Sequence, residues 1–265
     1  MNQPLSVSEM TPESARAIEY VLMDIDDTLT TEGKLSSGAY AALWDLKSAG
    51  LRVVPITGRP AGWCDLIARQ WPVDGVVGEN GAFAFWETEG RRLSSMTHPA
   101  AVRNDCATLG RIRERALVEV PGCRVARDQF SRLYDLAIDF AEEEPALPLE
   151  AAVRIKAICD EEGAIAKISS IHVNAWMGIY DKLTMAEAFL AARFGYNPAL
   201  DLEKVAFAGD SPNDEPMFAH FPTSCGVANV LRYINLMRAL PRFVASRECG
   251  EGFSEFARTL ISRRG

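Results

Sequence analysis

The sequence predicts an α/β fold, a Rossmann-like doubly wound parallel sheet into which a smaller α+β cap domain is inserted. Apolar runs alternate with amphipathic segments up to about Thr88, the order becomes helix-strand-strand as far as Gly178, and the first alternation then returns. Strands that alternate with helices pair in parallel, whereas helix-strand-strand units form antiparallel sheets with helices on one face. We therefore expect a core domain of residues 1–88 and 178–265 and an inserted domain of residues 89–177.

The elements of the core domain follow from hydrophobic periodicity and from the turn residues that interrupt it. The strands expected in it are residues 20–23, 52–56, 75–78, 205–208 and 224–227. The helices expected in it are residues 38–49, 61–70, 183–194 and 213–220, with closing elements up to residue 260. Four tryptophans are expected to pack in its interior: Trp44, Trp63, Trp71 and Trp86.

The inserted domain is expected to repeat one unit twice. Helices at about residues 100–120 and 149–162 are each followed by two strand runs. The first pair of strands is predicted at residues 124–127 and 132–139, and the second pair ends at Trp176. This order predicts an antiparallel sheet that carries both helices on one of its faces.

The last strand of the inserted domain is predicted to have two different faces. Alternation places Ile171, Val173 and Ala175 on one face and Ser170, His172, Asn174 and Trp176 on the other. Hydroxyl, imidazole and amide groups suit a polyhydroxylated ligand, so we expect the second face to contact the substrate. A half-buried strand that faces solvent fits the same pattern.

The composition excludes several classes of protein. Lys and Arg number 28 against 36 Asp and Glu, a formal charge of −8, and nucleic acids and anionic membranes need a basic surface. No apolar run in the sequence approaches the ~20 residues of a membrane span. The first residues lack the basic and apolar layout of a secretory signal. The six cysteines are too far apart in the sequence for a zinc or redox motif, so we expect reduced thiols. We expect a cytoplasmic protein; its oligomeric state stays open.

Acidic residues follow two of the predicted strands. Asp24 and Asp26 come directly after the first strand, and Asp210 and Asp214 come after the strand at residues 205–208. The first motif alone fits a solvated acidic loop, and the second alone fits a turn that caps a helix. Together they predict four carboxylates at one edge of the sheet, which repel one another unless a cation lies among them. Oxygen ligands without histidine or cysteine favour Mg²⁺.

Two further motifs supply groups that could hold a phosphate. Thr57, Gly58 and Arg59 follow the second strand and precede a helix, where a hydroxyl and backbone amides can bind an anion. Capping of that helix is the alternative role for Thr57. Lys182 stands at the predicted start of a later helix, where it is either a solvated charge or the cation that the acidic site lacks.

In this order, the four motifs resemble those of the haloacid dehalogenase superfamily of phosphatases. The resemblance rests on Asp24 to Thr28, on Thr57, on Lys182 and on Gly209 to Asp214. The insertion and Glu79-Asn80-Gly81-Ala82 resemble subfamily IIB, whose α/β cap occurs in sucrose-phosphate, trehalose-phosphate and mannosyl-phosphoglycerate phosphatases and in phosphomannomutases.

The resemblance implies an aspartyl-phosphate mechanism. Asp24 would attack phosphorus, and Asp26 would protonate the leaving group and then deprotonate water. The implied Mg²⁺ ligands are Asp24, the backbone carbonyl of Asp26 and Asp210, supported by Asp214. Thr57 and Lys182 would stabilise the transferring oxygens. Further contacts to phosphate or substrate are expected from Gly58, Arg59, Asn80, Ser170, His172, Asn174 and Asn213.

These features predict a Mg²⁺-dependent phosphomonoester hydrolase whose partner is a small phosphorylated metabolite. A sugar phosphate is the first expectation for the substrate. A phosphosugar mutase of the phosphomannomutase type remains open because it needs the same aspartyl phosphate. A non-catalytic sugar-phosphate sensor is the third hypothesis, and the presence of both Asp24 and Asp26 argues against it.

Overall fold

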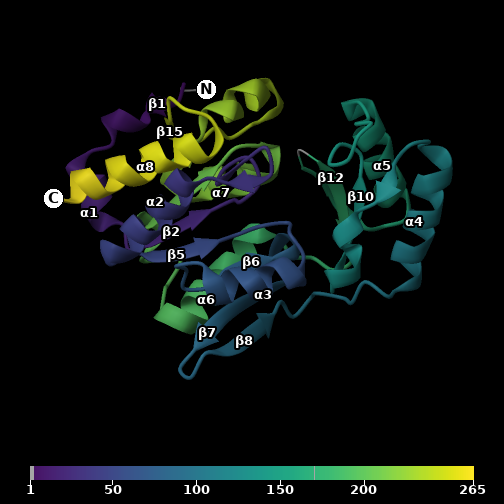
Figure 1. Ribbon diagram of the computed structural model, residues 1–265, viewed down its shortest axis with the longest axis horizontal. Coiled ribbons are helices and arrows are strands. Elements are labelled where there is room, and N and C mark those ends of the chain that lie inside the picture. The colour runs from purple at the N-terminus through teal and green to yellow at the C-terminus, as the bar shows by residue number, and fades with distance from the viewer. Residues whose placement is uncertain (1–2, 170) are drawn as a thin grey trace.

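A six-stranded parallel sheet forms the centre of the computed structural model, which describes residues 3–169 and 171–265 (Figure 1). Its order across the sheet is β1-β15-β14-β13-β2-β5. The strands are β1 (Leu5–Ser6), β2 (Tyr20–Met23), β5 (Arg52–Pro55), β13 (Val205–Gly209), β14 (Thr223–Gly226) and β15 (Phe243–Val244). Every pair of neighbours in this sheet runs in parallel, as the strand-helix alternation predicts.

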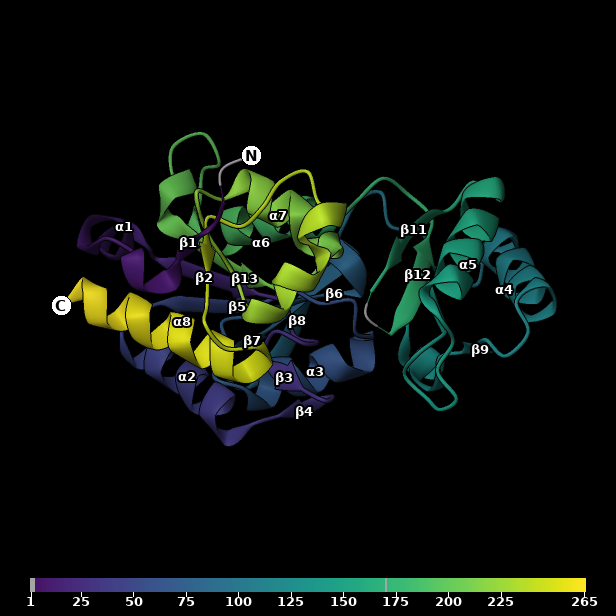
Figure 2. The same ribbon diagram turned by 90° about the horizontal axis from the view of Figure 1, so that it is seen from above.

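Helices cover both faces of this sheet, so the doubly wound fold predicted from the sequence is confirmed (Figure 2). In β2, Val21 and Met23 pack on one side while Tyr20 and Leu22 pack on the other, because successive side chains of a strand alternate. One face is covered by α1 (Pro12–Ala17), α2 (Ser37–Ser48), α3 (Ala61–Gln70) and α8 (Cys249–Arg264). The other face is covered by α6 (Lys182–Phe194) and α7 (Glu215–His220).

A three-stranded antiparallel sheet extends the core and corrects the predicted domain boundary. It consists of β6 (Val76–Gly78), β7 (Phe83–Thr88) and β8 (Arg92–Thr97), and a parallel bridge between Ile56 and Val77 joins it to the β5 side of the main sheet. The boundary predicted at residue 88 lies inside the β7–β8 hairpin. Because β8 pairs with β7 along its whole length, residues 89–97 lie with the core. We call residues 99–177 the inserted segment.

The inserted segment has its own antiparallel sheet and its own hydrophobic core (Figures 1 and 2). The order of its strands is β11-β12-β10-β9. They are β9 (Arg124–Val125), β10 (Asp135–Asp139), β11 (Ile165–Ile168) and β12 (His172–Trp176), and α4 (Ala107–Glu119) and α5 (Leu149–Glu161) pack on them. The helix predicted from about residue 100 begins at Ala107, because the preceding residues connect β8 to the segment.

The two faces of β12 match the predicted alternation. Val173 and Ala175 belong to the core of the inserted segment, whereas His172 and Asn174 face the core domain across a cavity. The two connections between the parts lie in contact. Gly178 has a φ of +103°, and a Cβ there would lie 1.8 Å from the carbonyl oxygen of Ala100, so only glycine fits.

One short hairpin rises beside the end of β2. It consists of β3 (Thr30–Thr31) and β4 (Lys34–Leu35), and its two turn residues, Glu32 and Gly33, both have positive φ, as a type I′ turn requires. None of the helices in the described part of the chain is long and apolar enough to cross a membrane.

Candidate active site

Three neighbouring strands of the main sheet end at the same edge, and each is followed by a predicted site residue. Asp24 follows β2, Thr57 comes two residues after β5, and Asp210 follows β13. The backbone N–H of Asp24 donates to Ala208 (2.9 Å), which continues the strand pairing up to the site. The carboxyl ends of parallel strands are where open α/β sheets bind ligands.

Three buried carboxylates form the centre of this edge. One oxygen each of Asp24, Asp210 and Asp214 lies within 4.8 Å of the others, and none of the three residues is more than 5% exposed. Burial raises the pKa of Asp24 to about 7, and repulsion by Asp214 and Asp26 adds to this. Burial, and repulsion by Asp214, Asp24 and Asp27, raise the pKa of Asp210 well above its usual range. A site of this charge and these hard oxygen donors fits a divalent cation such as Mg²⁺.

Lys182 is buried in the site and is paired, so the alternative of a solvated charge is wrong. Its Nζ donates to Oδ1 of Asp24 (2.8 Å) and to Oδ1 of Asp214 (2.9 Å). Burial lowers the pKa of Lys182, but these two carboxylates outweigh burial and raise it overall. Lys182 is the first residue of α6, and a capping box between Asp181 and Thr184 fixes the start of that helix.

Glycine at position 81 allows α6 to approach the site. Gly81 has a φ of +108°, and a Cβ there would lie 2.0 Å from the carbonyl oxygen of Asp181. The residue before it, Asn80, also has a positive φ and lines a cavity above Asp24. Its Nδ2 atom is buried and finds no hydrogen-bond partner among the residues described. An unpaired buried amide is costly, so this atom is a candidate contact for a ligand oxygen.

Glu79 connects the core to the inserted segment. Its carboxylate accepts the backbone N–H of Ala61 (3.0 Å) at the start of α3, and it also accepts the N–H groups of Leu133 (2.9 Å) and Tyr134 (2.6 Å) ahead of β10. Burial and the charge of Asp135 raise the pKa of Glu79, against the effect of the N–H donors, to about 7. The first residue of the Glu79-Asn80-Gly81 motif is thus an anchor for the inserted segment.

Thr57 does not cap the following helix. Helix α3 starts after Pro60, which makes no side-chain cap, whereas Oγ1 of Thr57 accepts the N–H of Arg59 (3.0 Å). The hydroxyl therefore keeps its own proton for donation to a ligand. Gly58 lies against the amide of Asn80, which a Cβ at position 58 would meet at 3.2 Å.

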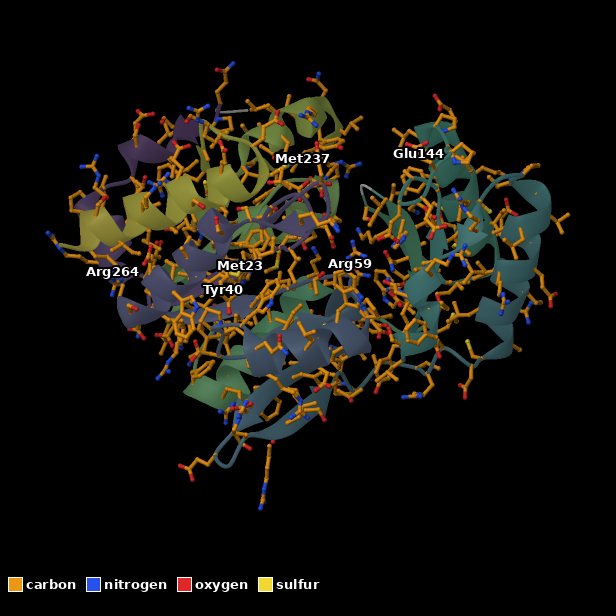
Figure 3. All side chains as sticks on the ribbon, in the orientation of Figure 1. Met23, Tyr40, Arg59, Glu144, Met237 and Arg264 are labelled. Carbon is orange, nitrogen blue, oxygen red and sulfur yellow. The ribbon has the colours of Figure 1, made fainter. Side chains whose placement is uncertain are left out.

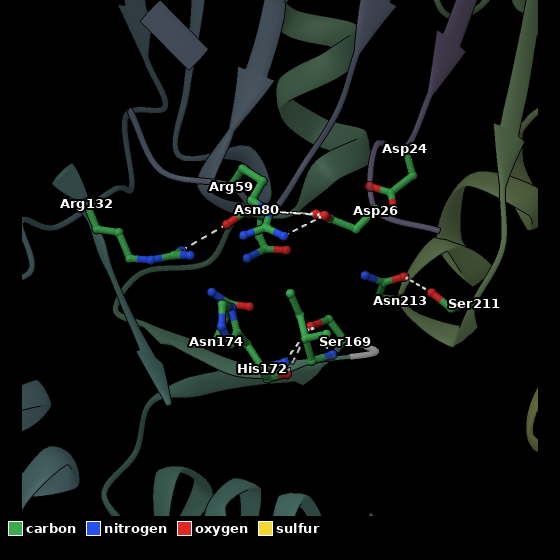
Figure 4. A pocket seen from close by; sticks show the side chains of 12 residues that line it. Asp24, Asp26, Arg59, Asn80, Arg132, Ser169, His172, Asn174, Ser211 and Asn213 are labelled. Carbon is green, nitrogen blue, oxygen red and sulfur yellow. Dashed lines mark hydrogen bonds and ion pairs between the residues drawn. The ribbon is translucent and has the colours of Figure 1, made fainter. Parts of the chain in front are cut away.

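A chain of charged contacts crosses from the core to the inserted segment, beginning at Arg59, which lies between the two parts in Figure 3 and is bound to Asp26 in Figure 4. Arg59 lies at the seam, by which we mean the contact surface between the core and the inserted segment. It donates to both oxygens of Asp26, with Nε at 3.0 Å and Nη2 at 2.8 Å. Its Nη1 donates to Oε1 of Glu142 (2.8 Å), and the other oxygen of Glu142 bonds Nε2 of His172 (2.8 Å). The hydrogen bond from His172 and the contact with Arg59 hold the pKa of Glu142 at about 2.

Two tryptophans depart from the packing predicted for them. Trp63 is 42% exposed, and its ring centroid lies 4.3 Å from the guanidinium carbon of Arg59. This cation–π contact helps to hold the guanidinium of Arg59 in place. Trp44 is 53% exposed on α2. In the sequence, a tryptophan at a helix position that faces the seam or solvent cannot be distinguished from one at a core position.

A second polar contact across the seam involves Arg132. Its side chain is fully buried and donates to the carbonyl oxygen of Gly58 (2.9 Å) and to both oxygens of Asp135 (3.0 Å). Asp135 in turn accepts Nδ2 of Asn174 (2.9 Å). The arginine thus fixes the predicted substrate-facing strand relative to the phosphate-binding loop predicted at Thr57.

Predicted residues from both parts of the chain line one cavity of about 20 Å³ (Figure 4). They are Asp24, Asp26, Gly58, Arg59, Asn80, His172, Asn174 and Asn213. Thr57, Lys182, Asp210 and Asp214 are not among its lining residues, and Ser170 lies outside the described residues. A cavity of this size holds about one water molecule. A larger ligand enters only if the inserted segment moves.

Four lining residues and one cross-seam residue have no role in the sequence-based prediction. Glu142 belongs to the acidic run Glu142 to Glu144, and such runs are typical of solvated surface, so no local pattern distinguishes it. The remaining four are Arg132, Ser169, Ile171 and Ser211. Of these four, only Ile171 falls within the predicted alternation of the last strand. That alternation places Ile171 with Val173 and Ala175, on the face away from the cavity.

Comparison with known proteins agrees with this architecture. Residues 21–108 match the family of haloacid dehalogenase-like hydrolases. That region contains Asp24, Asp26, Thr57 and Asn80. No curated protein sequence gives a significant match to the chain.

Solved structures share the fold over nearly the whole chain. A protein from Thermoplasma acidophilum is 18% identical, with 92% of this chain and 98% of that chain covered and a TM-score of 0.70. A protein from Plasmodium vivax described as a HAD/COF-like hydrolase is 16% identical, with 95% and 99% covered and a TM-score of 0.69. BT4131, described as a subclass IIB sugar phosphatase, is 14% identical, with 91% and 96% covered and a TM-score of 0.62. Residues 21–108 thus match the haloacid dehalogenase-like hydrolase family in sequence, and the solved structures show a shared fold over nearly the whole chain.

Proposed function

We propose that this protein is a Mg²⁺-dependent phosphomonoester hydrolase that acts on a small phosphorylated metabolite, in the first place a sugar phosphate. One observation carries the proposal: Asp24 lies buried at the sheet edge, is bound by Lys182, and shares a 4.8 Å cluster with Asp210 and Asp214. The sugar phosphatase among the structural neighbours supports the substrate class.

Asp24 is the nucleophile in this proposal. Its carboxylate attacks phosphorus, the P–O bond to the leaving group breaks, and an aspartyl phosphate forms. Lys182, which donates to Asp24, and the hydroxyl of Thr57 stabilise the charge on the transferring oxygens. Asn213 lines the cavity together with Asp24 and Asp26 and contacts the phosphate there.

Asp26 handles the proton in both half-reactions. It protonates the leaving oxygen and then removes a proton from the water that hydrolyses the aspartyl phosphate. Both of its oxygens are bound by Arg59 in the closed conformation described here. Arg59 therefore has to give up one of these oxygens when a substrate enters.

The acidic cluster provides the ligands for Mg²⁺. We assign Asp24, the backbone carbonyl of Asp26, and Asp210 to the ion, with Asp214 in support. A bound Mg²⁺ supplies positive charge that reduces the repulsion between a carboxylate nucleophile and an anionic phosphate. Asp214 also accepts the N–H of Asp210 (3.0 Å) and Nζ of Lys182, so it holds both the metal side and the lysine side of the site.

The inserted segment, together with Asn80 of the core, provides the contacts to the leaving group. His172, Asn174 and the unpaired Nδ2 of Asn80 face the cavity and offer the hydrogen bonds that a polyol needs. Closure of the segment excludes water and brings these groups to the substrate. This arrangement is the reason for preferring a sugar phosphate over an aryl or alkyl ester.

The first prediction concerns the reaction itself. In a panel of phosphorylated metabolites with Mg²⁺, the protein should release inorganic phosphate from at least one sugar phosphate without an activating bisphosphate. Asp24→Asn should abolish this release, because the amide is a far poorer nucleophile of nearly the same shape. Its thermal stability should not fall, since the substitution removes a buried charge.

Other results of this experiment identify the alternatives. Isomerised sugar phosphate that appears only with a bisphosphate activator would establish a mutase in place of the phosphatase. Binding of sugar phosphate without turnover would establish a sensor. Substantial turnover by Asp24→Asn would remove Asp24 from its proposed role.

The second prediction concerns the metal. Excess chelator should abolish turnover, and Mg²⁺ should restore it. Ca²⁺ should inhibit, because it accepts more oxygen ligands and can occupy the carboxylate oxygen of Asp24 that has to attack. Full activity in chelator would contradict the proposed metal site.

The third prediction concerns specificity. His172→Ala and Asn174→Ala should each lower kcat/KM for the best sugar phosphate by about 10- to 100-fold, the effect of an unpaired buried polar partner. Hydrolysis of p-nitrophenyl phosphate should hardly change, because its phosphate contacts core residues. Equal losses on both substrates would show that this strand has a structural role only.

The fourth prediction concerns movement of the inserted segment. Glu142→Ala removes the shorter of two ion pairs between Arg59 and the segment, 2.8 Å against 3.8 Å to Asp128. A contact of about 1 kcal/mol corresponds to a roughly fivefold shift toward the open form. Small-angle X-ray scattering of the substrate-free protein should show a larger radius of gyration. Glu143→Ala is the matched control, since Glu143 pairs with Arg124 and Arg127 inside the segment. Identical scattering by both variants would show that Glu142 does not hold the segment closed.

A further inference from the structure

Asn229 is a buried residue that contacts two separate parts of the candidate metal site. It lies in a 3₁₀ helix (Ala228–Leu236) directly after β14, and its side chain is 4% exposed. Nδ2 donates to the carbonyl oxygen of Asp27 (3.0 Å) and to Oδ2 of Asp210 (3.3 Å). Oδ1 accepts the N–H of Cys249 (3.0 Å). Because that N–H can only donate, the orientation of the amide is fixed.

The carboxylate of Asp210 is held by two neutral donors. Oγ1 of Thr28 donates to Oδ1 (3.1 Å), and Asn229 donates to Oδ2. The ammonium of Lys182, by contrast, bonds Asp24 and Asp214. Neutral donors fix the direction of a carboxylate while they leave its charge available, and each oxygen keeps a second lone pair for a cation. Asp210 is therefore oriented for a cation without being neutralised by one from the protein.

The second contact of Asn229 fixes the loop that carries the other ligands. Asp27 has a φ of +58°, an unfavourable conformation for a residue with a side chain. Its N–H donates to Oγ1 of Thr30 (3.2 Å), and its carbonyl accepts from Asn229. Since the N–H of Asp27 and the carbonyl of Asp26 belong to one planar peptide, the first bond sets the direction of that carbonyl. The second bond fixes the next peptide of the loop.

We propose that Asn229 is a positioning residue for the divalent cation. It holds Asp210 and the Asp26–Asp27 loop, which come from different strands, in one fixed relation, so the metal ligands are arranged before the ion binds. Outer partners of metal ligands typically contribute 10- to 100-fold to metal affinity. The inference rests on the proposed Mg²⁺ site, and nothing in the local sequence pattern points to it.

The test measures Mg²⁺ binding to the substrate-free protein by calorimetry. Asn229→Ala should raise the Kd for Mg²⁺ by at least about 10-fold, and Thr28→Val, which removes the other donor to Asp210, should act in the same direction. At saturating Mg²⁺, kcat of Asn229→Ala should stay within about threefold of the wild type. A residue with a merely structural role would lower thermal stability in chelator and leave the Kd for Mg²⁺ unchanged.

Ser224→Ala is the matched control. Ser224 is buried in neighbouring β14, and its hydroxyl bonds the N–H of Arg242 (3.1 Å), away from the carboxylates. This variant should lose stability and keep the wild-type Kd. An unchanged Kd in Asn229→Ala, or failure of that variant to fold, would overturn the inference and leave the proposed function standing. Absence of Mg²⁺ binding by the wild type at millimolar concentration would overturn the proposed function itself.

Discussion

The repulsion among three carboxylates buried within 4.8 Å of one another is the constraint on which the rest of the site depends. A group of this kind is stable only if positive charge reaches it from inside the protein or from a bound ion. Lys182 supplies one such charge, and it does so only because Gly81 lets the start of α6 come close to the sheet edge. Asp210 is left to neutral donors, and that leaves room for a cation.

The contacts between the core and the inserted segment are of two kinds, which lie in different places. Near the two connections they are apolar, with Trp176 stacked on Tyr180 at 5.5 Å and both packed in the core cluster that contains Phe83. Around the cavity they are polar and charged, through Arg59 and Arg132. Replacing polar contacts by contacts with water costs little free energy, whereas exposing buried apolar surface to water costs much more. The segment is thus firmly attached at one end and can separate at the other.

Much of the core could be predicted from the sequence because its signals are local. The strand β2 and the motif at Asp24 occupy adjacent positions in the chain, and a strand followed by carboxylates can be recognised there. Strand β8 was assigned to the inserted domain because its place in the core depends on pairing with β7, which in turn pairs with β6, and the sequence pattern does not show these pairings. Asn229 and Glu142 act on residues 202 and 83 positions away, at Asp27 and Arg59, and no local pattern encodes such contacts.

The tripeptide Glu79-Asn80-Gly81 shows why the parts of this site are difficult to change separately. Glu79 binds backbone N–H groups at the start of β10, Asn80 turns an unpaired amide toward the cavity, and Gly81 makes room for Lys182. All three have a positive φ, which only glycine adopts at low cost, so the neighbouring contacts must stabilise the turn. A shift of this turn would therefore move the anchor of the inserted segment, a cavity wall and Lys182 together. Such coupling would make the position of the segment sensitive to the occupancy of the cavity.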